Sequence, residues 1–176
     1  ADQVAADGFI AVAPDLISRV RGGPSTTELP GDSARRLIAG VNAAERNRGI
    51  AAVARWAMSQ PAADARYAVI GYCWGGSTVF MHAVHGGIAG YSGGVAFYGG
   101  FPYMDGGVPV ADSVRKIAKP VMLLNGANDT RIGSAMPAID STMKALGKAY
   151  TGVNYPGAIH GFLRAQDDRA TPRDTT

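Results

Sequence analysis

Apolar and polar residues alternate in blocks along the chain, and the blocks follow two different periods. Short, unbroken apolar runs that end at Pro, Gly or Asp are typical of buried strands in a parallel sheet. We expect five such strands, at residues 9–13, 67–70, 94–98, 121–124 and 149–155.

Helical patterns separate these strands. The clearest covers residues 42–59, where Ile50, Val53, Ala54 and Ala57 recur at steps of three and four. Further helices are predicted at residues 34–39, 77–85 and 137–146, and residues 18–31 read as a loop because of their Gly and Pro pairs. Strands that alternate with helices indicate the α/β class, with a mostly parallel sheet flanked by helices.

Composition narrows the class of protein. A length of 176 residues fits a single domain, residues 1–176, and 47% hydrophobic residues are enough to build a core. The net charge of +3, without a basic block, gives no reason to expect nucleic acid as a partner. The sequence does not indicate the oligomeric state. The compartment, cytoplasmic or periplasmic, also stays open, because the start of the chain shows no targeting pattern.

No charged residue occurs from Tyr67 to Met104, a run of 38 residues. This run is interrupted by Gly75-Gly76, Gly86-Gly87 and Gly93-Gly94 and by two His, which is unlike a membrane span. We therefore expect a strand, a helix and a strand in the middle of a covered sheet.

Cys73 is the only cysteine, which excludes an intrachain disulfide and any zinc site built from several cysteines. It stands in Gly71-Tyr72-Cys73-Trp74-Gly75, a G-x-C-x-G motif between a predicted strand and a predicted helix. The related serine motif is a strained turn that presents a nucleophile above a sheet, with glycines where a Cβ would clash. The helix N-terminus favours a thiolate, and the Trp74 N–H is the expected first oxyanion donor. Two alternatives are a buried Cys that packs as a small hydrophobe and a redox thiol with an external partner thiol.

A cysteine nucleophile needs a histidine base that a carboxylate orients. His82 and His85 lie within the helix that leaves Cys73, too far along its axis, and no third ligand suggests a metal site for them. His160 follows the last strand and Asp129 follows strand 121–124, so both are expected at the same sheet edge as Cys73. An exposed loop histidine and a helix-capping aspartate are the simpler alternatives for these two residues.

Together these motifs resemble the dienelactone hydrolase (carboxymethylenebutenolidase) family of the α/β-hydrolase superfamily. The resemblance runs over nearly the whole chain and is carried by residues 8–16, 69–76, 97–99, 119–126 with Asp129, and 159–162. A Cys in place of Ser in the turn is its most specific element. The resemblance implies an α/β-hydrolase fold and a Cys73–His160–Asp129 triad that cleaves a carboxylic ester or lactone through a thioester, with no metal or cofactor required.

The resemblance also implies a small, anionic ester or lactone as substrate. It suggests Arg164 as a ligand for the substrate carboxylate, and a second arginine for which Arg35 and Arg36 are candidates. Tyr98, at the end of a strand, is a candidate for lining the pocket. A general carboxylesterase on the same triad, or a non-catalytic α/β-hydrolase-like fragment, are the alternatives.

The family pattern includes strands that would precede Ala1. These strands carry a second oxyanion donor and a Glu that contacts the resting cysteine. The family's last helix would be missing or reduced to residues 164–176. We therefore expect the chain to hold the central and C-terminal part of the domain.

Overall fold

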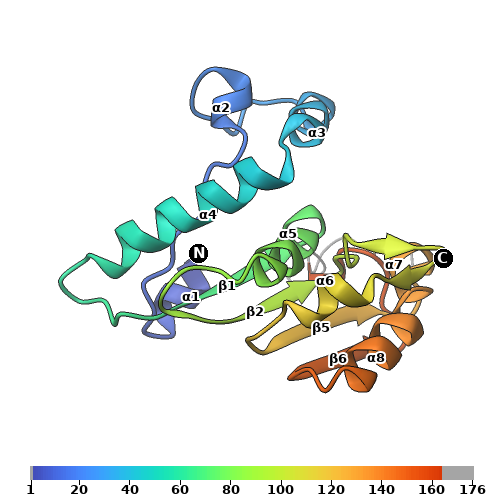
Figure 1. Cartoon of the computed structure of the whole chain (residues 1–176). Coiled ribbons are helices and arrows are strands. Elements are labelled where there is room, and N and C mark those ends of the chain that lie inside the picture. Colours follow the sequence, from blue (N-terminus) through green and yellow to red (C-terminus); the bar gives the residue numbers. More distant parts are fainter. Residues whose placement is uncertain (1, 164–176) are drawn as a thin grey trace. The chain divides into compact units, whose positions relative to one another are not determined.

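A computed structural model describes residues 2–163, which divide into two compact units between Arg66 and Tyr67 (Figure 1). The first unit is helical. Its elements are α1 (Asp2–Ala6), α2 (Ser18–Arg21), α3 (Gly31–Gly40) and α4 (Ala43–Met58). The single domain expected from the length stays a prediction.

Helix α4 confirms the longest predicted helix. The Asn42 side chain accepts a hydrogen bond from the Glu45 N–H at 2.9 Å and so caps the first turn. Ile50 and Ala54 are buried, while Val53 and Ala57 are half-buried. The apolar residues at steps of three and four therefore do mark one face of this helix.

The strand predicted at residues 9–13 is wrong. This segment forms no strand, and its large side chains are exposed, with Phe9 at 67%. A strand needs a hydrogen-bonding neighbour, and among residues 2–163 this segment pairs with none. An unbroken apolar run thus indicates a tendency toward burial, but it does not specify a neighbouring strand.

The second unit is built on four parallel strands, in the order β1-β2-β5-β6 (Figure 1). They are β1 (Tyr67–Tyr72), β2 (Tyr91–Phe97), β5 (Val121–Gly126) and β6 (Tyr150–Tyr155). These four strands confirm the remaining predicted ones and the parallel sheet. A short antiparallel hairpin, β3 (Met104–Asp105) with β4 (Val108–Pro109), was not expected from the sequence.

The helices of this unit connect the strands. They are α5 (Trp74–Val84), α6 (Ala111–Arg115), α7 (Thr130–Gly133) and α8 (Met136–Ala145). The strands follow chain order across the sheet, and parallel crossovers are right-handed, so α5, α6 and α8 cover the same face. In agreement, α6 contacts both α5 and α8.

The hydrophobic core lies on the helix-covered face of the sheet. Phe80 of α5, Leu123 of β5 and Ile139 of α8 are fully buried in it. Ile70, Tyr72 and Met122 are exposed in the described chain. The uncharged run forms β1, α5 and β2, and within residues 2–163 no helix has the length and apolar character to cross a membrane.

Close backbone packing shapes the turn between β1 and α5. A Cβ on Gly71 would lie 2.1 Å from the Gly75 carbonyl oxygen, and one on Gly76 would lie 2.8 Å from the Phe97 carbonyl oxygen. A Cβ on Gly75 would meet nothing within 4 Å. The prediction that a Cβ would clash is therefore confirmed for Gly71 and wrong for Gly75. The close approach occurs at the neighbouring Gly76 instead.

Gly76→Ala is expected to destabilise the protein by about 1–3 kcal/mol, because its Cβ would press on the backbone at the end of β2. The neighbouring Gly75→Ala is the matched control and should leave stability unchanged or raise it by up to about 1 kcal/mol, since alanine favours the helix. Urea unfolding midpoints of the two variants measure the difference. Equal losses would contradict the packing described for Gly76.

His82 is a buried polar group in this core. Its Nε2 lies 2.9 Å from the Tyr67 hydroxyl, which itself accepts a hydrogen bond from the Ile88 N–H at 3.0 Å. The Tyr67 hydroxyl can donate its proton to Nε2 of a neutral imidazole. Burial, with a smaller contribution from nearby His85, lowers the pKa of His82 to about 4.

This buried histidine should make stability depend on pH. Between pH 6.5 and about 4 the unfolded chain protonates His82 and the folded chain does not, so stability falls as the pH drops through this window. The loss should reach about 3 kcal/mol, the free energy that corresponds to the shift. Unfolding free energies across this range should show a flatter slope for His82→Gln. The exposed His85→Gln is the control, and a slope unchanged in His82→Gln would exclude His82 as its source.

Candidate active site

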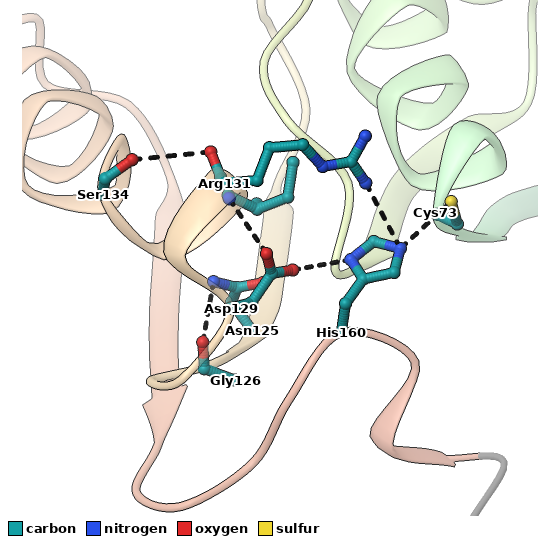
Figure 2. Close-up of polar contacts among 8 residues, drawn as sticks. Cys73, Asn125, Gly126, Asp129, Arg131, Ser134 and His160 are labelled. Carbon is teal, nitrogen blue, oxygen red and sulfur yellow. Dashed lines mark hydrogen bonds and ion pairs between the residues drawn. The ribbon is translucent and has the colours of Figure 1, made fainter. Parts of the chain in front are cut away.

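The carboxyl ends of all four parallel strands meet at one edge of the sheet, and each is followed by a candidate residue. Cys73 comes directly after β1 and Tyr98 directly after β2. Asp129 follows β5 and His160 follows β6. The structure thus brings Cys73, Asp129 and His160 together at the edge where the sequence predicted them (Figure 2), and Tyr98 contacts the His160 ring there.

Cys73 occupies a strained turn. Its φ of 56° is unusual for a residue with a side chain, and it stands at the N-cap of α5. Its N–H donates to the Phe97 carbonyl at 2.9 Å, and its side chain is partly exposed. Trp74 is the first residue of α5, beside the thiol, where a backbone oxyanion donor would be needed.

His160 lies between Asp129 and Cys73. Its Nδ1 is 2.6 Å from Asp129 Oδ2, and its Nε2 is 3.2 Å from Cys73 Sγ (Figure 2). A carboxylate only accepts hydrogen bonds, so Nδ1 carries a proton, and in the neutral imidazole Nε2 then presents its lone pair to the thiol. This geometry allows Nε2 to receive the proton of Cys73.

Asp129 uses its two carboxylate oxygens differently. Oδ2 faces His160, while Oδ1 accepts the Ile132 N–H at 3.1 Å and caps α7. The side chain is 3% exposed, so a buried charge is balanced by these hydrogen bonds. Asp129 therefore fills both of the roles considered for it: it caps a helix, and it is the partner of His160.

The loop that carries His160 is tied to the turn that carries Asp129. Ala127 N–H donates to the Tyr155 carbonyl and Asn128 N–H donates to the Ala158 carbonyl, both at 2.9 Å. A Cβ on Gly126 would lie 2.3 Å from the Ala158 oxygen, so only glycine fits this close approach. These backbone contacts bring the imidazole within reach of the carboxylate.

Tyr98 packs against the imidazole. Its ring lies edge-on to the His160 ring, with centroids 5.2 Å apart, and makes a similar contact with Phe162 at 5.5 Å. Only 4% of Tyr98 is exposed, and its φ of 39° is again unusual. The structure therefore places Tyr98 beside His160, and a contact with substrate stays a prediction.

Arg131 is a residue of this site that the sequence analysis missed. Its guanidinium Nη2 lies 3.5 Å from His160 Nε2, and the side chain extends from α7 toward the imidazole (Figure 2). Within residues 2–163 it forms no ion pair with a carboxylate. The sequence did offer one signal that Arg131 belongs to this site, because Arg131 comes two residues after Asp129, at the same sheet edge.

Two of the other predicted arginines, Arg35 and Arg36, belong to the first unit. Arg35 pairs with Asp32 at 2.6 Å, and Arg36 donates to Ser33 Oγ at 3.1 Å, all on the first unit. Arg164 lies outside the described residues. Substrate binding by these three arginines stays a prediction. In the described part of the chain, His, Cys, Asp and Glu form no cluster of three that could hold a metal ion.

Several solved structures are similar to this chain and share its fold. A solved structure of a proposed dienelactone hydrolase from Klebsiella pneumoniae is 26% identical, with a TM-score of 0.76, over 98% of this chain and 71% of that chain. A dienelactone hydrolase-like promiscuous phosphotriesterase from metagenomic libraries is 24% identical, with a TM-score of 0.68, over 91% of this chain and 63% of its own. A puromycin-hydrolysing peptidase of Mycobacterium tuberculosis, 18% identical with a TM-score of 0.56 over 66% of this chain and 22% of its own, shows the fold alone.

No curated protein matches the chain. The family model for the dienelactone hydrolase family, in contrast, matches residues 1–175. The mostly parallel sheet flanked by helices agrees with this match and with the α/β-hydrolase fold. With nearly every residue covered, the chain belongs to the dienelactone hydrolase family.

Proposed function

We propose that the chain hydrolyses a carboxylic ester or lactone with Cys73 as nucleophile, His160 as base and Asp129 as the residue that orients the base. The family supports a hydrolase that acts on esters or lactones. The observation that carries the finer proposal is the unbroken series of contacts from Asp129 Oδ2 to His160 Nδ1 and from Nε2 to Cys73 Sγ.

Acylation begins when Nε2 of His160 takes the thiol proton and Sγ attacks the carbonyl carbon. The new C–S bond turns the carbonyl oxygen into an oxyanion, for which the Trp74 N–H is the proposed donor. The C–O bond then breaks, and the proton on Nε2 passes to the leaving oxygen. Asp129 stabilises the imidazolium through Nδ1–H and keeps its charge in this step.

Deacylation uses the same groups. Water attacks the thioester carbon while Nε2 takes a proton from it, and the C–S bond breaks to release the carboxylic acid. The proton returns from Nε2 to Sγ, which restores the resting thiol and imidazole. None of these steps calls on a metal or a cofactor.

The proposed substrate is a small, anionic ester or lactone, with Arg164, Arg35, Arg36 and Tyr98 as candidates to contact it. A general carboxylesterase is the alternative within the same chemistry. Matched esters with and without a carboxylate on the acyl group distinguish the two, because an anion-binding site raises kcat/KM for the charged ester.

Acylation of Cys73 should appear as a burst of p-nitrophenolate when p-nitrophenyl acetate is mixed with the protein. Because Cys73 is the only cysteine, iodoacetamide should abolish the burst by alkylating one site. Cys73→Ala should lose the burst and at least about 10⁴-fold in turnover, since the three residues act as a unit. A burst that persists in Cys73→Ala, or its absence in the folded wild-type chain, would reject the proposal in favour of a non-catalytic protein.

Asp129→Asn separates the two contacts of this side chain. An amide oxygen can still accept the Ile132 N–H, so stability should change little, whereas the lost charge no longer fixes the proton on Nδ1. Turnover should fall by about 10⁴-fold. Asp129→Ala is the comparison, because it should lose the cap as well, about 1 kcal/mol. If Asp129→Asn keeps a tenth or more of wild-type turnover, Asp129 does not orient His160.

A further inference from the structure

Arg131 places a cation at the reacting atom of His160. Its Nη2 lies 3.5 Å from Nε2, the same nitrogen that lies 3.2 Å from Cys73 Sγ. The guanidinium only donates hydrogen bonds, so it can share the Nε2 lone pair with the thiol while the imidazole is neutral. In the proposed function, Nε2 is also the atom that gives its proton to the leaving oxygen.

The charges at this edge of the sheet change during acylation. With a proton on His160, the two cations Arg131 and His160 face two anions, the Asp129 carboxylate and the Cys73 thiolate. Once sulfur is bonded to carbon, the thiolate charge has moved to the substrate. Two cations this close repel each other, so the site then favours a negatively charged oxygen between them.

The leaving oxygen is the substrate atom that must come to Nε2, because it receives the proton there. An atom within hydrogen-bond distance of Nε2 lies close to the Arg131 guanidinium as well. Within residues 2–163 no carboxylate pairs with this guanidinium, so its hydrogen-bond donors can turn to the substrate.

We propose that Arg131 is a catalytic residue that donates a hydrogen bond to the leaving oxygen as the C–O bond breaks. The electron pair of that bond goes to the oxygen, the proton comes from Nε2, and Arg131 keeps all of its protons. This role rests on the proposed function and deepens it. It makes Arg131 the residue that extends the substrate range toward esters with more basic leaving oxygens, such as unactivated aryl and enol esters.

A series of para-substituted phenyl acetates tests this role, because the acyl group stays constant while the basicity of the leaving oxygen changes. Arg131→Gln should lower kcat/KM by about 100-fold for phenyl acetate and by less than about fivefold for p-nitrophenyl acetate. The plot of log kcat/KM against leaving-group basicity should therefore be steeper than in the wild type. Arg131→Lys, which keeps the charge, should restore part of the loss for phenyl acetate.

Arg115→Gln is the control, since Arg115 is an exposed arginine on α6 that pairs with Asp112. It should follow the wild type across the whole series. An equal loss for every ester in Arg131→Gln, or no loss, overturns the role of Arg131 while the p-nitrophenolate burst still supports the proposed function. Failure of the wild-type chain to give that burst overturns both.

Discussion

Backbone hydrogen bonds that continue past the ends of the strands hold the candidate residues in place. Three of them join neighbouring strand ends: Cys73 N to Phe97 O at 2.9 Å, Tyr98 N to Leu124 O at 2.8 Å, and Ala127 N to Tyr155 O at 2.9 Å. Each extends the parallel ladder by one residue beyond a strand. The positions of the thiol, the aromatic ring and the acidic turn are thus set by the main chain, and the side chains need only their rotamers to meet.

The four-residue helix α7 links the folding of this edge to its charges. Its N-cap is Asp129, so the carboxylate that starts the helix also holds His160. Arg131 is its second residue and reaches the other nitrogen of the same ring. The Asp129 carboxylate and the Arg131 guanidinium therefore lie on either side of the His160 ring and come from the same short helix and its N-cap. The contacts that position α7 position both charged groups.

Local patterns in the sequence predicted most of the sheet and the core of the site, because apolar runs, punctuating glycines and residues just past a strand are local signals. Strand pairing is not local, so the run at residues 9–13 was assigned to a strand that it does not form. Arg131 was missed for a related reason: its direction depends on a four-residue helix too short to show any periodicity. The contributions of Arg35, Arg36 and Arg164 stay predictions.

The turn at Cys73 depends on the glycines around it as much as on its side chains. A φ of 56° costs a non-glycine residue about 1–3 kcal/mol, so its surroundings must impose it. They do so by packing backbone on backbone: a Cβ on Gly99 would lie 2.4 Å from the Gly76 carbonyl carbon, and one on Gly71 would strike the Gly75 carbonyl. With glycine at these positions, α5 can begin directly against the end of β2. The turn then presents the thiol of Cys73 to His160.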